Sequence, residues 1–119
     1  MKYLAAIVNT LDQKKARNIQ IINVSQSNPL AEYYVICDAD SDRQCEALAK
    51  AVEDTLNTMN RDVHHIEGRK SKWVLVDANN IIVHIFHTSE RDKYGLDRLW
   101  SDHPRIDIEE LLHSKGDLQ

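Results

Sequence analysis

The sequence predicts an α/β sandwich in which three to four helices pack against a mixed five-stranded sheet. Apolar residues recur at three- and four-residue steps in two long stretches, as on helices with one apolar face. Five short runs are rich in the β-branched and aromatic residues that favour strands. The order is helix, two strands, helix, three strands and a helix-like segment, and 119 residues is the length of one domain.

The first half of the chain contains two predicted helices and two predicted strands. Residues 1–11 carry one apolar stripe of a helix, and residues 19–24 form a strand that leads into a loop rich in Ser, Asn and Pro. The run 33–37 (YYVIC) has no polar alternation, so we expect a central strand covered on both faces. Ser41 opens a capping-box pattern, S-D-R-Q, which places the start of a helix that continues to about Met59.

The second half predicts a weak strand, a hairpin and a helix-like segment. Residues 63–67 form a more polar strand, typical of a sheet edge. The apolar runs 73–76 and 81–87 are joined by Asp-Ala-Asn-Asn, and this pattern is typical of a β-hairpin because Asp and Asn favour turns. Residues 89–92 are predicted to be a charged connection, and residues 94–100 to be helical.

The C-terminal residues 102–119 are predicted to be an extension of the domain. The sequence Asp-His-Pro at residues 102–104 interrupts the preceding pattern. Apolar residues within 108–112 then indicate one more short helix, and we expect the chain end to fray. The domain itself is therefore placed in residues 1–101.

Composition and charge restrict the classes of function. The formal net charge is −4 and no basic cluster stands out, which disfavours a nucleic-acid-binding domain held by phosphate contacts but suits a basic protein partner. No apolar run approaches the roughly twenty residues of a membrane span, and the N-terminal residues lack the pattern of a signal or transit peptide, so we expect a cytoplasmic protein. Cys37 and Cys45 lie in apolar patterns and are predicted to be core thiols.

The histidines predict no metal site. His84 and His87 are three apart on a strand, and His64 and His65 are adjacent, so the members of each pair point to opposite faces. No pair can chelate an ion without ligands from a second segment. His84 interrupts an apolar strand, and it needs a hydrogen-bond partner if it is buried.

The strand 81–87 predicts a sheet with two apolar faces. Alternation places its residues on two sides: Ile81, Val83, Ile85 and His87 on one, and Ile82, His84 and Phe86 on the other. Three or four helices are too few to cover a five-stranded sheet twice, and an uncovered apolar face marks an interaction site. The sequence leaves open whether the large aromatic residues near this strand are core or interface.

Several segments together resemble the ribosomal silencing factor family (RsfS, or Iojap-like proteins). The segments that carry the resemblance are W-V-L-V-D at 73–77, I-V-H-I-F at 82–86 and R-x-x-Y-x-L-D-R-L-W at 91–100. The resemblance extends upstream and covers roughly residues 3 to 101, in order and at matching spacings. It implies that residues 1–101 are a silencing-factor domain, with a fold similar to that of nucleotidyltransferases.

The resemblance also implies a partner and a mechanism. Family members bind the fourteenth protein of the large ribosomal subunit (uL14), sterically block joining to the small subunit and repress translation under nutrient limitation. The family's binding surface lies around the hairpin and the segment after it. The candidate contacts carried over to this chain are Trp73, Ala78, His84, Phe86, Tyr94, Leu96 and Trp100. Members of this family usually have a larger residue at the position that Ala78 occupies here.

Two further contacts are expected. The basic loop that holds Arg69, Lys70 and Lys72 is a solvated loop by default, and the resemblance makes a minor contact to ribosomal RNA conceivable. The apolar face could also pair with a second copy of the chain, which predicts a homodimer away from the ribosome.

The alternative function is a metal-dependent nucleotidyltransferase. Asp38 and Asp40 are spaced like a pair of carboxylates that holds two metal ions. In transferases, however, such a pair lies on the strand after the long helix, and here that strand, 63–67, offers only Val-His-His-Ile-Glu. We therefore predict a strand-to-helix loop for the two aspartates, with no enzymatic activity and no cofactor.

Overall fold

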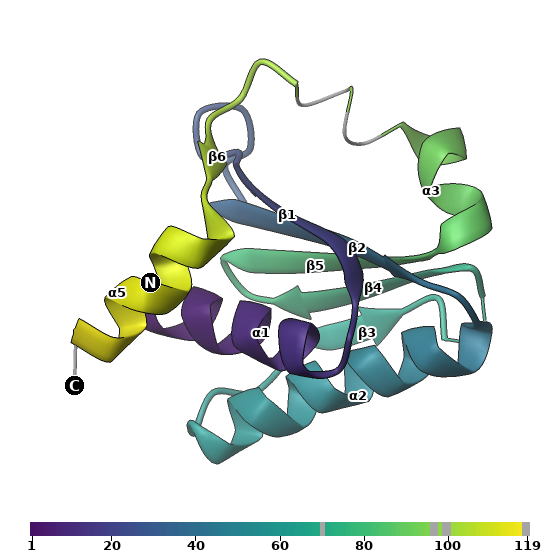
Figure 1. Ribbon diagram of the computed structural model, residues 1–119, viewed down its shortest axis with the longest axis horizontal. Helices are drawn as coiled ribbons and strands as arrows, with labels where there is room; N and C mark the ends of the chain where they lie inside the picture. The colour runs from purple at the N-terminus through teal and green to yellow at the C-terminus, as the bar shows by residue number, and fades with distance from the viewer. Residues whose placement is uncertain (70, 96–97, 99–100, 118–119) are drawn as a thin grey trace.

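The computed structural model describes residues 1–69, 71–95, 98 and 101–117 (Figure 1). Its helices are α1 (Lys2–Gln13), α2 (Asp42–Thr58), α3 (Thr88–Tyr94) and α5 (Ile108–Asp117). Its strands are β1 (Arg17–Asn23), β2 (Tyr33–Ala39), β3 (His65–Glu67), β4 (Trp73–Ala78), β5 (Ile81–His87) and β6 (Arg105–Ile106). The predicted α/β fold with a mixed sheet is confirmed.

The sheet has six strands where the sequence predicts five. Their order is β3-β4-β5-β2-β1-β6, and the sheet is mixed because β2 and β5 run parallel while the other neighbours are antiparallel. The additional strand, β6, consists of Arg105 and Ile106 and pairs with Ile22 and Ile21 of β1. Two residues after a proline are too few to produce a periodic pattern, so only the tertiary contact with β1 reveals this strand.

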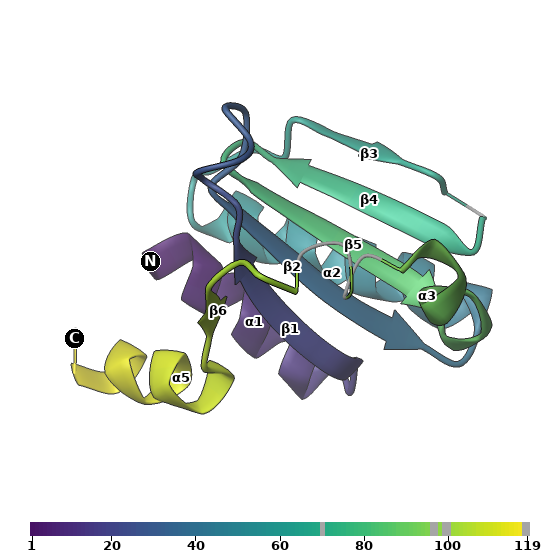
Figure 2. The ribbon, with the colours of Figure 1, turned by 90° about the horizontal axis from the view of Figure 1, so that it is seen from above.

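One face of the sheet is covered by α1, α2 and α5. Figure 2 shows α1 and α2 behind the strands, where α2 contacts β2, β4 and β5 while α1 contacts α2 and β1. The main core lies between these layers, and its residues are almost fully buried: Leu4, Ile7, Val8 and Leu11 of α1, Leu48, Val52 and Leu56 of α2, and Val35, Val74, Val76, Val83 and Ile85 of the strands. We call the side of the sheet that these helices cover the helix face. The predicted alternation of side chains along β5 is confirmed.

The segment after β5 is a helix instead of the predicted charged connection. Helix α3 begins after His87, whose Nδ1 accepts a hydrogen bond from the Ser89 backbone N–H at 3.1 Å, and it ends at Gly95 with φ +62°. Glycine adopts this left-handed conformation without steric cost, so it stops the helix. A helix of seven residues has too few apolar positions to produce a recognisable periodic pattern in the sequence.

The predicted N-terminus of α2 and the predicted hairpin are both confirmed. Ser41 is the N-cap, and its Oγ accepts a hydrogen bond from the Gln44 backbone N–H at 3.1 Å. The turn between β4 and β5 is shorter than the predicted four residues, because Asp77 and Ala78 belong to β4. Asp77 Oδ1 accepts a hydrogen bond from the Asn79 N–H at 3.1 Å, and Asn79 has φ +69°. Both Asp and Asn act as the turn chemistry predicts.

Candidate interaction surface

The face of the sheet opposite α1, α2 and α5 is largely free of helices in the described part of the chain, and we call it the open face. Helix α3 crosses only its end, in front of the strands in Figure 2. Cross-strand pairing arranges the side chains of this face in three rows: Trp73, Phe86 and Asp38; Leu75, His84 and Ile36; and Asp77, Ile82 and Tyr34. Trp73, Leu75, Ile82 and Tyr34 are all partly exposed. Ile36 and Phe86 on the same face are fully buried in a second core cluster, so the open face presents only part of its apolar surface to solvent.

Trp73, His84 and Phe86 form a compact aromatic cluster on the open face. The Trp73 and Phe86 rings stack with centroids 5.0 Å apart, and Phe86 is fully buried beneath. The Trp73 Nε1–H donates to His84 Nδ1 at 3.2 Å, which fixes the orientation of both rings. Tyr34 packs edge-on against His84 at 4.7 Å. Such aromatic pairs add to the stability that burial provides.

His84 is held as a neutral imidazole. Burial lowers its pKa from 6.5 to about 4, because the charged ring would lose its hydration. Since Nδ1 accepts the Trp73 hydrogen bond, Nε2 carries the remaining proton. This Nε2–H is buried and has no hydrogen-bond partner among the described residues. The expectation that a buried His84 finds a partner is thus met at one ring nitrogen and not at the other.

The depressed pKa of His84 predicts a loss of stability in acid. The unfolded chain takes up the proton below pH 6.5, whereas the folded protein resists it down to about pH 4, so stability is lost as pH falls through this window. We expect His84 to contribute about 3 kcal/mol of this loss. Urea unfolding at several pH values should show a shallower decline for His84→Phe than for the wild type. Equal slopes for both proteins would contradict this assignment.

The structure brings some of the predicted contact residues together and separates others. Trp73, His84 and Phe86 lie side by side on the open face, where Trp73 is partly exposed and the other two are buried. Ala78 faces the helix layer and is 1% exposed. Tyr94 ends α3 beside the open face, and its side chain is not among those described. The remaining two, Leu96 and Trp100, lie outside the described residues.

A buried ion pair joins α3 to the sheet, and the sequence analysis missed it. Asp38 lies within β2 and is fully buried, so the expectation of a strand-to-helix loop is wrong for this residue. Arg91 of α3 donates from Nη1 to Asp38 Oδ1 at 2.7 Å and to the Asn18 carbonyl at 2.5 Å. Asp38 Oδ2 accepts from the Thr88 hydroxyl at 2.8 Å. Asp38 therefore holds α3 in place through both carboxylate oxygens.

The second aspartate of the candidate metal pair is separate from Asp38. Asp40 lies after β2, is exposed, and pairs with Arg17 at 2.8 Å. The only sequence signal for the buried pair is that Asp38 ends an apolar run and that Arg91 begins the R-x-x-Y pattern. Neither signal specifies a contact between two segments more than fifty residues apart.

The two cysteines are core residues, as predicted. Cys37 and Cys45 are fully buried and unbridged. Burial raises the pKa of the Cys45 thiol to about 11 and raises the pKa of the Cys37 thiol further. Both thiols remain protonated at neutral pH, which leaves them poor nucleophiles.

The basic loop before β4 is described only in part. Arg69 is exposed, Lys72 forms an exposed ion pair with Asp42 at 3.5 Å, and Lys70 lies outside the described residues. Gly68 has φ +78°, and an added Cβ would lie 2.2 Å from the Trp73 carbonyl oxygen. Only glycine fits at this close approach of the backbone, so Gly68 helps to position Trp73.

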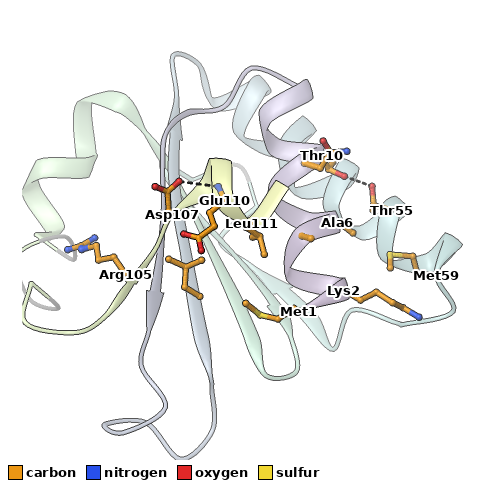
Figure 3. A pocket seen from close by; sticks show the side chains of 13 residues that line it. Met1, Lys2, Ala6, Thr10, Thr55, Met59, Arg105, Asp107, Glu110 and Leu111 are labelled. Carbon is orange, nitrogen blue, oxygen red and sulfur yellow. Dashed lines mark hydrogen bonds between the residues drawn. The ribbon is translucent and has the colours of Figure 1, made fainter. Parts of the chain in front are cut away.

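A half-open cavity of about 770 Å³ lies on the helix side of the molecule (Figure 3). Its lining comes from α1, α2, β6 and α5 and includes Met1, Ala6, Met59, Ile106 and Leu111. At one end, the Thr10 and Thr55 hydroxyls share a hydrogen bond of 2.8 Å. Charged side chains such as Lys2, Arg105 and Glu110 also line it. The cavity is separated from the open face by the sheet.

Among the described residues, no helix combines the length and the apolar character needed to cross a bilayer.

Comparison with known proteins places these features in a family. A family model described as "Ribosomal silencing factor during starvation" (RsfS) matches residues 1–118. Two proteins named ribosomal silencing factor RsfS are similar to the chain. The one from Halalkalibacterium halodurans is 31% identical over 110 residues, which cover 92% of this chain and 94% of the relative. The one from Bacillus subtilis is 35% identical over 99 residues, which cover 82% and 84%.

A solved structure supports the same assignment. The crystal structure of a protein from Chromobacterium violaceum superimposes with a TM-score of 0.80 at 30% sequence identity, and the match covers 83% of each chain. The sequence resemblance, the family model and the fold thus agree over most of the chain. The protein belongs to the ribosomal silencing factor (RsfS) family.

Proposed function

We propose that this protein represses translation by binding the large ribosomal subunit through uL14 and blocking its association with the small subunit. The supporting observation is a partly exposed apolar surface on the open face that includes Trp73, on a chain that belongs to the RsfS family. The mechanism is steric exclusion and requires no bond to be made or broken. It acts under nutrient limitation, in the cytoplasm.

The chemistry of the open face suits a protein partner. Trp73 is partly exposed but rests on buried Phe86 and is hydrogen-bonded to His84, so its ring is held rigidly. A rigid aromatic anchor loses little conformational entropy when it binds. Trp is among the residues that dominate binding energy at the centres of interfaces. We propose Trp73 as the main anchor, with Tyr94, Leu96 and Trp100 as contacts from the segment after β5.

The other proposed contact residues act differently. His84 and Phe86 are buried and support Trp73 from below. Ala78 is on the helix face, where it supports the hairpin rather than meeting a partner. The sequence segment with Arg69, Lys70 and Lys72 is the proposed site of a minor contact with ribosomal RNA. The net charge of −4 favours encounter with a basic ribosomal protein, because opposite charge speeds association.

We propose that the protein acts without catalysis and without a cofactor of nucleotidyl transfer. The two aspartates that could have held metal ions are committed to other partners: Asp38 to Arg91 and Thr88, and Asp40 to Arg17. In the absence of the ribosome, the open face is the surface that would join two copies into a homodimer. Light scattering over a range of concentrations would measure that association.

Capture of ribosomal subunits by the immobilised protein tests the proposal. We expect the large subunit, and isolated uL14, to be retained, and the small subunit to pass through. Because the proposed contact is largely apolar, retention should fall only modestly as salt rises. Retention that disappears at moderate salt would indicate phosphate contacts to RNA instead. Specific, tight binding of a nucleotide with Mg²⁺ in the same preparation would favour the transferase alternative.

A further inference from the structure

His64, His65 and Asp77 come together at the β3 edge of the sheet, and we propose that they form a binding site for a divalent transition-metal ion such as Zn²⁺. Each of the three side chains offers one ligand atom, and these atoms lie within 4.8 Å of one another. The site is at the edge of the sheet, beyond the aromatic cluster of the open face. Its two histidines lie outside the open face, whereas Asp77 lies in the row of the open face nearest the hairpin turn.

Backbone pairing between β3 and β4 builds the site. His65 lies directly opposite Asp77 in the antiparallel register, and the His64 backbone N–H donates to the Asp77 carbonyl at 2.8 Å. The two histidines are thus fixed, through the main chain, to the residue that supplies the carboxylate. Their rings lie edge to face with centroids 5.3 Å apart. A metal–nitrogen bond is about 2.0–2.1 Å, and the two histidine side chains are exposed and can rotate toward an ion beside the half-buried Asp77.

The sequence analysis expected His64 and His65 to point to opposite faces. That rule applies to successive residues of a strand, and β3 begins only at His65. His64 precedes the strand, so its side chain is free of the alternation. The second segment that chelation requires is β4, which supplies Asp77.

Contacts with neighbouring groups orient two of the three ligands, Asp77 and His65. Asp77 Oδ1 accepts the Asn79 N–H, and Asp77 Oδ2 lies 3.7 Å from His65 Nδ1. The other ring nitrogen, His65 Nε2, lies 3.2 Å from Glu67 Oε1. A histidine that binds a metal commonly donates its second N–H to a carboxylate, which fixes the ring and raises its basicity. Glu67 is therefore a positioning residue for His65.

The ligand set selects the class of ion. Two imidazoles and one carboxylate suit Zn²⁺, Co²⁺ or Ni²⁺, whereas Mg²⁺ and Ca²⁺ prefer oxygen ligands throughout. Three protein ligands leave at least one coordination position for water or for a group from another molecule. The site is exposed, so an ion can enter and leave directly.

Calorimetric titration of the tag-free protein with ZnCl₂ and, separately, with MgCl₂ tests the proposal. We expect one Zn²⁺ to bind per chain and Mg²⁺ to give no signal. The variants His64→Ala and Asp77→Asn should each weaken Zn²⁺ binding by more than about tenfold, and Glu67→Gln by about tenfold. Bound Co²⁺ should show the intense visible absorption of a site with a low coordination number. We expect this absorption in the wild type only.

His103→Ala is the matched control. His103 lies 2.9 Å from Asp102, and among the described residues it belongs to no group of three potential ligands, so its loss should leave Zn²⁺ binding unchanged. Circular dichroism melts verify that each variant is folded, and His64→Gln replaces His64→Ala if the latter is not. Absence of Zn²⁺ binding by the wild type, or equal affinity in the His64 and Asp77 variants, would overturn the proposal.

Discussion

Replacing Arg91 with alanine is expected to lower the free energy of unfolding by about 3–5 kcal/mol, the typical result of removing one partner from a buried ion pair. The side chains of Arg91 and Asp38 are 8% and 1% exposed, so the change leaves the Asp38 carboxylate in the interior without its cation. The Asn18 carbonyl loses its donor as well. Urea unfolding of the variant and the wild type at neutral pH measures the difference.

Arg17→Ala is the matched control for this prediction. Arg17 also pairs with an aspartate, Asp40, at 2.8 Å, but both side chains are more than half exposed. Pairs of this kind contribute about 0–1 kcal/mol because water and salt screen them. A loss for Arg91→Ala no larger than for Arg17→Ala would show that the buried pair does not hold α3 on the sheet.

Replacing Trp73 with alanine is expected to weaken binding to isolated uL14 by about 2 kcal/mol or more, which is roughly thirtyfold in affinity. The variant removes the partly exposed ring that stacks on Phe86, and it also removes the donor to His84 Nδ1. We expect Tyr94→Ala to weaken binding in the same direction. Calorimetry or surface plasmon resonance with purified uL14 measures the change.

Two controls separate lost contact from lost stability in that experiment. Trp73→Phe keeps an aromatic ring over Phe86 and should retain more affinity than Trp73→Ala. Met59→Ala removes an apolar side chain that lines the cavity on the helix side, so it should leave binding unchanged. If Trp73→Ala bound uL14 as tightly as the wild type while folded, Trp73 would be core and not interface.

The sequence predicts the parts of the fold that depend on local chemistry and periodicity. The cap at Ser41, the hairpin between β4 and β5 and the two faces of β5 are all found as predicted, because each depends on residues close together in the chain. The recognisable order of the family motifs predicts the assignment that the family model confirms. Tertiary packing decides which elements cover each face of the sheet. The number of predicted helices limits only how much of the sheet can be covered.

The features that the sequence analysis missed all depend on contacts between distant segments. Arg91 reaches Asp38 across more than fifty residues, and β6 exists only because β1 provides an edge for it. His64 and His65 acquire a common neighbour only when β3 pairs with β4. For the same reason, the sequence does not reveal that two of its candidate contacts, Phe86 and Ala78, are buried, the first beneath Trp73 and the second on the helix face.

The joining of purified ribosomal subunits, followed by sedimentation, tests the central claim most directly. Large subunits are first incubated with increasing amounts of the protein, and small subunits are then added under conditions that favour joining. We predict that the fraction of joined ribosomes falls with dose and reaches its minimum when one protein is bound per large subunit. Normal joining of large subunits that demonstrably carry the protein would contradict the proposal that it silences the ribosome by steric exclusion.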